Sequence, residues 1–114
     1  MAIDTTTEKN NLCTRYGTDT AYASLHTGDP GTTGTGEISG GSPAYARKAV
    51  TWSAPSNGQI TASVTFDVAS GVTVAGVGLW TAATGGSYLD GTTITSQTLG
   101  AQGTVQVSLT FSAA

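Results

Sequence analysis

The chain has 114 residues, of which 38% are hydrophobic and only 10% are charged, and its formal net charge is −3. It contains 22 Thr and 11 Ser, so hydroxyl groups take the place of charges on the surface. This composition excludes a coiled coil, a transmembrane protein and a basic nucleic-acid-binding protein. The length predicts a single domain over 1–114, with a helical segment at 1–17 and a β-sandwich at 20–114.

The N-terminal segment predicts a short helix. Thr5 and Glu8 have the spacing of a capping box, and Gly17 is a natural C-terminal stop. Cys13 is the only cysteine and falls on the apolar face of this helix, so we expect it in the core. The sequence shows no signal peptide, and the absence of a possible intrachain disulfide fits folding in a reducing cytoplasm.

From Thr20 onward the pattern is that of β-strands. Alternation predicts strands at 21–26, 45–52, 60–66 and 104–111, and a run apolar on both faces at 72–80 predicts a central strand. A short strand at 87–89, a turn at Asp90-Gly91 and a weak polar edge strand at 92–99 complete the set. Asn57-Gly58 is a hairpin turn signal, and 28–43 is a long loop rich in Gly and Thr. The fold class is therefore all-β: an antiparallel β-sandwich or jelly-roll-like barrel with one short N-terminal helix.

The sequence gives little support to catalysis or metal binding. His26 is the only histidine, and we expect it to be a hydrogen-bonded structural residue rather than a catalytic base. Asp29 and Asp90 are expected to form turns, since a calcium site gathers several acids. No enzyme activity and no cofactor are predicted. Trp52, Trp80, Tyr45 and Tyr88 could form a carbohydrate-binding platform, but we favour the interpretation that both tryptophans fill the core.

Several separated motifs resemble a family. These are Leu25-His26-Thr27-Gly28-Asp29-Pro30-Gly31, Tyr45-Ala46-Arg47 after Gly40-Gly41, Val50-Thr51-Trp52, and Val77-Gly78-Leu79-Trp80. They resemble small virion proteins of tailed bacteriophages, particularly those of actinobacterial hosts. Such proteins are described as head decoration, tail or fibre-associated proteins. The resemblance covers most of the chain and implies a structural role in the virion.

The expected function follows from this resemblance and from the low charge. We expect a decoration or cement protein on the outer capsid surface that stabilises the shell by bridging subunits. Its predicted partners are the major capsid protein and copies of itself, in a trimer, with no nucleic acid and no membrane. The candidate interface residues are His26, Asp29, Glu37, Tyr45 and Arg47, with Arg47 meeting an acid such as Glu37 or Asp29 across the interface. A tail or fibre-tip component is the second interpretation, and a carbohydrate-binding adhesion module is the third.

Overall fold

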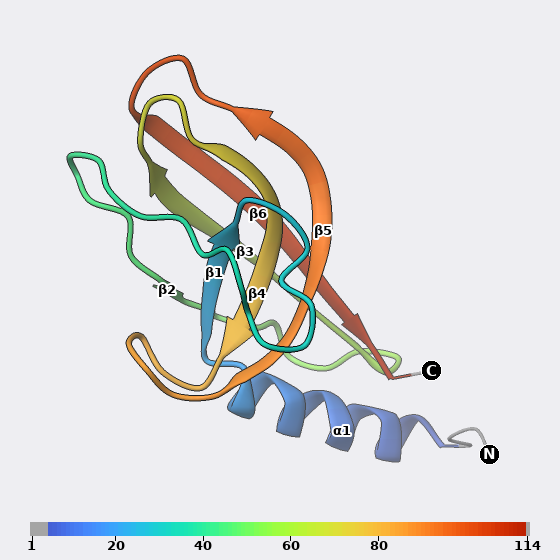
Figure 1. Cartoon of the computed structure of the whole chain (residues 1–114). Helices are drawn as coiled ribbons and strands as arrows, with labels where there is room; N and C mark the ends of the chain where they lie inside the picture. Colours follow the sequence, from blue (N-terminus) through green and yellow to red (C-terminus); the bar gives the residue numbers. More distant parts are fainter. Residues whose placement is uncertain (1–4, 114) are drawn as a thin grey trace.

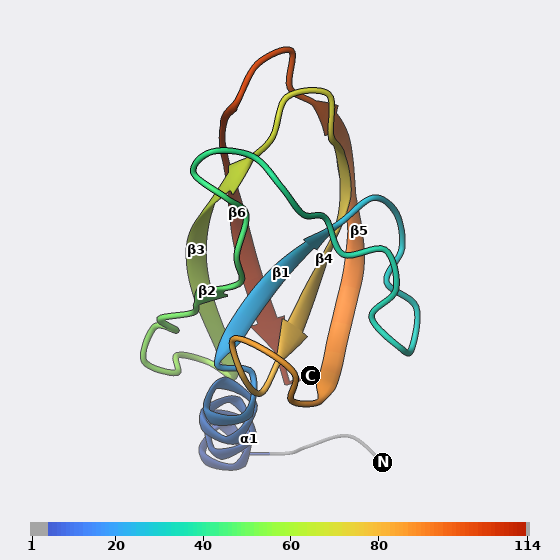
Figure 2. The same ribbon diagram turned by 60° about the vertical axis from the view of Figure 1, so that its left-hand side comes forward.

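Two antiparallel sheets face each other, with a helix across one end (Figures 1 and 2). A computed structural model describes residues 5–113. Its elements, in chain order, are α1 (Thr6–Asp19), β1 (Tyr22–His26), β2 (Lys48–Ala49), β3 (Gln59–Val68), β4 (Thr73–Trp80), β5 (Tyr88–Thr98) and β6 (Gly103–Ser112). The four-stranded sheet has the order β2-β1-β4-β5, and the two-stranded sheet pairs β3 with β6. The predicted sandwich is confirmed, and the barrel alternative is not, because the sheets remain separate.

The core lies between the two sheets and follows the alternation of the sequence. β3 and β6 pair without a register shift, from Gln59 opposite Ser112 to Val68 opposite Gly103. Their inward side chains are buried, whereas Thr61, Ser63 and Thr65 point outward and are exposed. β4 runs between β1 and β5, as its apolar character on both faces predicts. The hydroxyl-rich residues therefore form the outer face of the two-stranded sheet.

The helix begins as predicted but continues beyond the expected stop at Gly17. The Thr5 hydroxyl accepts a hydrogen bond from the Glu8 N–H at 3.2 Å, and the helix ends at Asp19. Gly17 serves packing instead, because a Cβ at this position would lie 3.2 Å from the Trp52 ring. Cys13 is fully buried in a second apolar cluster with Ile60 and Ala113, which confirms its predicted place in the core.

The segment expected to form a short strand, a turn and an edge strand is one continuous strand, β5. The Asp90-Gly91 turn prediction is wrong: Asp90 pairs with Leu79, and Gly91 pairs with Gly78 in the ladder to β4. The pairing shifts at Tyr88, which lies opposite Trp80 and leaves Leu89 as an extra, exposed residue. A bulge therefore absorbs the irregular sequence that a turn was expected to explain. The predicted position of this strand at the sheet edge is confirmed.

The strand predicted at 45–52 is reduced to the two residues of β2, because this segment crosses from one sheet to the other. Val50 N–H donates to the Ala21 carbonyl of the four-stranded sheet at 2.9 Å. Ser53 N–H donates to the Thr61 carbonyl of the two-stranded sheet at 2.8 Å. A segment that serves both sheets in turn cannot remain in one ladder. The Asn57-Gly58 turn that follows has the predicted positive φ values, 51° and 72°.

The long loop at 28–43 is a third layer over the outer face of the four-stranded sheet (Figure 2). Gly76 on β4 makes room for the loop, because a Cβ there would collide with the Gly28 carbonyl. Gly78 makes room for the side chains of β1 instead, since a Cβ there would lie 2.7 Å from Ser24 Oγ. Two residues of the loop are buried: Pro30, and Ile38, which joins the main core. The predicted long loop is therefore confirmed as a loop, and it packs against its own sheet.

Candidate functional site

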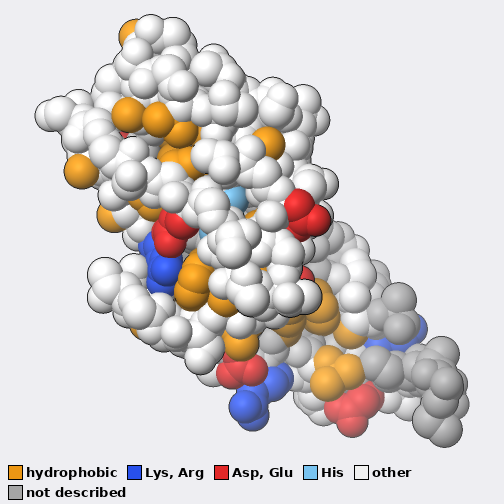
Figure 3. All heavy atoms as spheres, in the orientation of Figure 1, with side chains coloured by type: hydrophobic (Ala, Val, Ile, Leu, Met, Phe, Trp, Pro, Cys, Tyr) orange, Lys and Arg blue, Asp and Glu red, His pale blue; other side chains and the backbone are white. Residues whose placement is uncertain are grey.

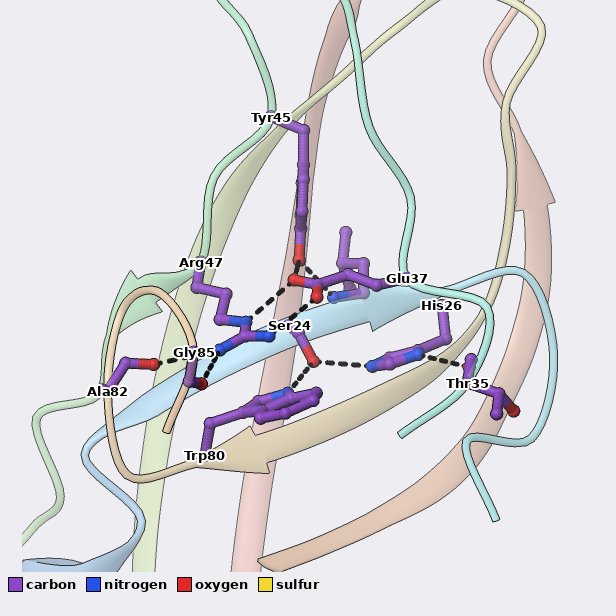
Figure 4. Close-up of polar contacts among 10 residues, drawn as sticks. Ser24, His26, Thr35, Glu37, Tyr45, Arg47, Trp80, Ala82 and Gly85 are labelled. Atoms are coloured by element: carbon purple, nitrogen blue, oxygen red, sulfur yellow. Dashed lines mark hydrogen bonds and ion pairs between the residues drawn. The ribbon is translucent and has the colours of Figure 1, made fainter. Parts of the chain in front are cut away.

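A cluster of polar side chains lies between the long loop and β1, and it contains four of the five candidate interface residues (Figure 4). Ser24 and His26 project from β1 toward the loop, which contributes Thr35 and Glu37. The segment before β2 adds Tyr45 and Arg47, and the end of β4 adds Trp80. β1 presents Ser24 and His26 on its outer face because Ala23 and Leu25, at the alternate positions, fill the core.

Arg47 is the centre of the cluster. Its Nε donates to Glu37 Oε2 and its Nη2 to Glu37 Oε1, both at 3.0 Å, so the ion pair is bidentate. Nη1 donates to the Ala82 and Gly85 carbonyls at 3.2 and 2.9 Å, which ties down the turn between β4 and β5. The guanidinium also stacks on the Trp80 ring, 3.6 Å from its centroid. Arg47 therefore joins three segments that are distant in sequence.

His26 is held in one tautomer by its neighbours. Its Nδ1 lies 2.7 Å from the Thr35 carbonyl, which can only accept, so Nδ1 carries the proton. Nε2 then accepts from the Ser24 hydroxyl at 2.6 Å, and Ser24 Oγ accepts from Trp80 Nε1 at 2.7 Å. The ring is fully buried. This arrangement confirms the predicted structural histidine and places it behind the surface.

Tyr45 closes the cluster from the other side. Its hydroxyl accepts from the Leu25 N–H at 3.0 Å and donates to Glu37 Oε2 at 2.8 Å. Burial is the main cause that raises the pKa of Tyr45 above its ordinary value. Burial also acts to raise the pKa of Glu37, but the hydrogen bonds from Arg47 and Tyr45 outweigh it and lower that pKa. Glu37 is therefore a charged acceptor whose oxygens are already engaged.

The structure brings together His26, Glu37, Tyr45 and Arg47 but leaves Asp29 apart. Asp29 is exposed and accepts a hydrogen bond from the Gly31 N–H at 2.9 Å, which confirms the predicted turn. The Arg47–Glu37 pair was expected across an interface and is found within the chain. The arrangement works as an internal clamp that fixes the long loop to β1 and to the turn between β4 and β5.

Ser24, Trp80 and the Thr35 carbonyl belong to the cluster and were not predicted as part of it. Ser24 carries a usable signal, since it shares a strand face with His26 at the i, i+2 spacing. Trp80 follows Gly76 and Gly78 on the same face of β4, so it also lies toward the loop. The Thr35 carbonyl could not be predicted in the same way, because every residue has a main-chain carbonyl.

Asp90 and the two tryptophans also have structural partners. Asp90 accepts from the Tyr16 hydroxyl at 2.6 Å and from the Gly91 N–H at 2.8 Å. Trp52 packs edge-on against Tyr16 and donates to the Thr20 carbonyl, whereas Trp80 lies beneath Arg47. The two tryptophans thus have separate surroundings, and Trp80 also packs edge-on against Tyr88.

The described residues, 5–113, contain no group of metal-binding side chains. Within this range, no three His, Cys, Asp or Glu side chains lie close enough together to hold a metal ion. No helix there has the length and apolar character needed to span a bilayer. Every buried side-chain nitrogen or oxygen described has a hydrogen-bond partner.

Comparison with known proteins gives a family. Residues 8–112 match the family described as Podophage GP4 fiber I protein gp80. The chain belongs to this family. No curated protein and no solved structure is significantly similar to the chain.

The match covers nearly the whole domain, including the helix, both sheets and the polar cluster. It identifies a structural protein of phage fibres and a place in the virion. The resemblance to phage virion proteins is thereby confirmed, whereas an actinobacterial host receives no support. The match also supports the fibre interpretation, which the sequence analysis placed second to capsid decoration.

Proposed function

We propose that the chain is a non-enzymatic building block of a fibre on a tailed phage, where it joins other virion proteins through its uncharged surfaces. The family match over residues 8–112 is the observation that carries this proposal. A fibre component must hold its shape and present contact surfaces, and it needs no reactive centre. The properties of this domain agree with those requirements.

The shape and the surface support a fibre role. The domain measures 47 × 22 × 21 Å, so it is about twice as long as it is wide. The face shown in Figure 3 is dominated by uncharged side chains and backbone, with charges in isolated spots. Thr61, Ser63 and Thr65 face outward beside Thr110 and Ser108 on the two-stranded sheet. Such a face contacts a neighbouring protein without electrostatic repulsion.

The polar cluster supports a role without catalysis. The His26 ring is buried with both nitrogens engaged, and Glu37 is paired with Arg47. A general base or a nucleophile needs a free position facing substrate, and neither group offers one. We therefore assign the cluster to the rigidity of the domain.

Capsid decoration predicts a different location and different partners, namely the major capsid protein at lattice positions. An amber mutation in the gene separates the two functions. A fibre protein is expected to leave particles with intact, DNA-filled heads that lack a fibre by negative-stain microscopy and adsorb poorly. Normal fibres together with heads that lose DNA on dilution or heating would overturn the fibre proposal in favour of decoration.

A further inference from the structure

The two long sides of the sandwich differ in whether further segments of the chain hydrogen-bond to their edge strands. On the side of β2 and β3, the segment 48–53 bridges the sheets, and residues 36–38 continue along β1. The Ile38 N–H donates to the Leu25 carbonyl at 3.1 Å, and Ser53 N–H donates to the Thr61 carbonyl. On the other side, β5 and β6 are both edge strands. Apart from their own ladders, no backbone–backbone hydrogen bond reaches 89–98 or 103–112 within the described residues.

The outward-facing groups of β6 can be assigned from its register. The Ala113 N–H donates to the Gly58 carbonyl at 2.8 Å, and hydrogen-bonded pairs alternate along an antiparallel ladder. Ser108 lies opposite Ser63, five pairs further along, where both backbones turn their N–H and C=O groups away from each other. The backbone of Ser108 therefore faces the open side, and so do those of Gln106 and Thr110.

A groove runs between these two edges. It has a volume of about 420 Å³, and its apolar lining comes from both sheets and from the helix end. Ile94 of β5 and Phe111 of β6 are half-buried at this site, and Tyr16 stacks on Phe111 with ring centroids 3.8 Å apart. The sandwich is thus left open where its two-stranded sheet is narrower than the sheet it covers.

Natural edge strands are blocked by charges, prolines, bulges or a covering segment. β5 is interrupted by the bulge at Leu89 and by a second register shift opposite Val74–Gly76. β6 pairs with β3 without any shift and carries none of these protections. From Gly91 to the end of the sequence there is no charged residue and no proline. Asp90 is the one charged residue that lines the groove, and its carboxylate is engaged by Tyr16 and Gly91. The open side is therefore electrically neutral over most of its length.

We propose that a second copy of this chain covers the open side, with β6 pairing antiparallel to β6 of the partner about a two-fold axis. A strand of this kind is complementary to itself, because a two-fold rotation places its own outward N–H and C=O groups opposite one another. Neutral faces of identical sequence do not repel. The joined sheet, β3-β6-β6-β3, has four strands and extends an apolar inner face across both grooves.

The size of the open side allows a stable dimer. Ten residues of β6 span about 34 Å, and the whole molecule, loop layer included, measures 22 × 21 Å across its long axis, so a full side face is at most that wide. This gives at most on the order of 700 Å² per copy, or about 1,400 Å² in total, within the range of specific interfaces. The inference goes beyond the fibre assignment and does not depend on it, since it rests on the edges and the groove alone.

The test is the mass of the purified protein by light scattering, together with hydrogen exchange. We expect twice the 11.3 kDa of one chain at micromolar concentration, with the amides of Ser108 and Thr110 protected at high concentration and exposed on dilution. Ser108→Pro removes an outward N–H without removing a bond to β3, and should weaken the dimer at least tenfold. Ser63→Pro is the matched control on the opposite edge and should leave the dimer intact. Ile94→Lys, which places a charge in the groove, should also give monomers.

Three results would overturn the proposal. A monomer at 100 µM would exclude the dimer. A trimer would exclude the two-fold pairing and agree with the oligomer expected from the sequence. A dimer that survives both Ser108→Pro and Ile94→Lys would lie on another surface. If Ser108→Pro does not fold, concentration-independent exchange of the Ser108 and Thr110 amides in the unaltered protein would be equally decisive.

Discussion

Arg47 is the residue at which the long loop, the approach to β2 and the turn between β4 and β5 meet. Four of its five N–H donors bind two carboxylate oxygens and two carbonyls in a planar arrangement that a lysine ammonium does not reproduce. Its side chain is only 10% exposed. Removal of one partner from an ion pair with this burial leaves the other partner poorly solvated and unpaired, so it is expected to cost much more than removal of one partner from a surface pair.

Arg47→Ala is accordingly expected to reduce the free energy of unfolding by about 2–4 kcal/mol, because it leaves Glu37 and two carbonyls without their donor. Urea denaturation measures this loss. Arg15→Ala is the control, since Arg15 forms an exposed pair with Asp19 and should change the stability by less than about 0.5 kcal/mol. Equal effects of the two substitutions would contradict the clamp.

The lowered pKa of Glu37 predicts a loss of stability in acid. The folded-state pKa lies below the ordinary value of 4.5, so the stabilisation is fully present above pH 4.5 and is lost as the pH falls through the folded-state value. Glu37→Gln should therefore be less stable than the unaltered protein at pH 6, and the difference should shrink toward pH 3. Urea midpoints measured at both pH values test this, and a difference independent of pH would contradict it.

Sequence reasoning found most of the residues in this cluster but misjudged their role. The residue types were sufficient to predict that Arg47 pairs with an acid, Glu37 or Asp29, but not which of the two, and not the hydrogen bonds of Tyr45. Whether such a pair lies within a chain or between chains depends on where the loop packs. That placement depends on the missing side chain at Gly76, whose effect appears only when β4 is set beside β1.

At the scale of elements, β4 and the long loop form one unit. The backbone of the loop approaches β4 so closely that Gly76 faces the Gly28 carbonyl and the Pro30 ring. Contact of this kind requires glycine on the strand, although glycine otherwise weakens strands. The close contact at Gly76 thus positions the long loop, which contributes Thr35 and Glu37 to the polar cluster.

Gly76→Ala is expected to destabilise the domain by about 1–3 kcal/mol, because the new methyl group collides with backbone that has no space to move. Thermal or urea unfolding measures the effect. Gly28→Ala is the matched control: a Cβ there meets nothing within 4 Å, so stability should change by less than about 0.5 kcal/mol. A neutral Gly76→Ala would show that the loop is not packed on β4.

The strands with clean alternation, β3 and β6, were predictable almost to the residue. The errors fall on segments whose backbone serves two partners or contains a bulge. The segment at 45–52 divides its hydrogen bonds between two sheets, and β5 contains an extra residue at Leu89. A sequence pattern records which face a side chain takes, but it does not record which neighbour receives the backbone hydrogen bonds.

Across the whole molecule, the few charged residues are unevenly distributed. Pairs such as Arg47–Glu37, Lys48–Asp67 and Arg15–Asp19 join much of the charge within the chain. The C-terminal fifth of the sequence has none and supplies the open side of the sandwich. A rigid domain with one neutral side of open edge strands is suited to an ordered assembly such as a fibre.

The most direct test of the fibre assignment is a cryo-electron microscopy map of the phage particle that carries this protein. We predict that the domain, with its 47 Å long axis and its end helix, fits density within a fibre attached to the virion. Density for the domain at lattice positions on the outer capsid shell, with none in the fibres, would contradict the account.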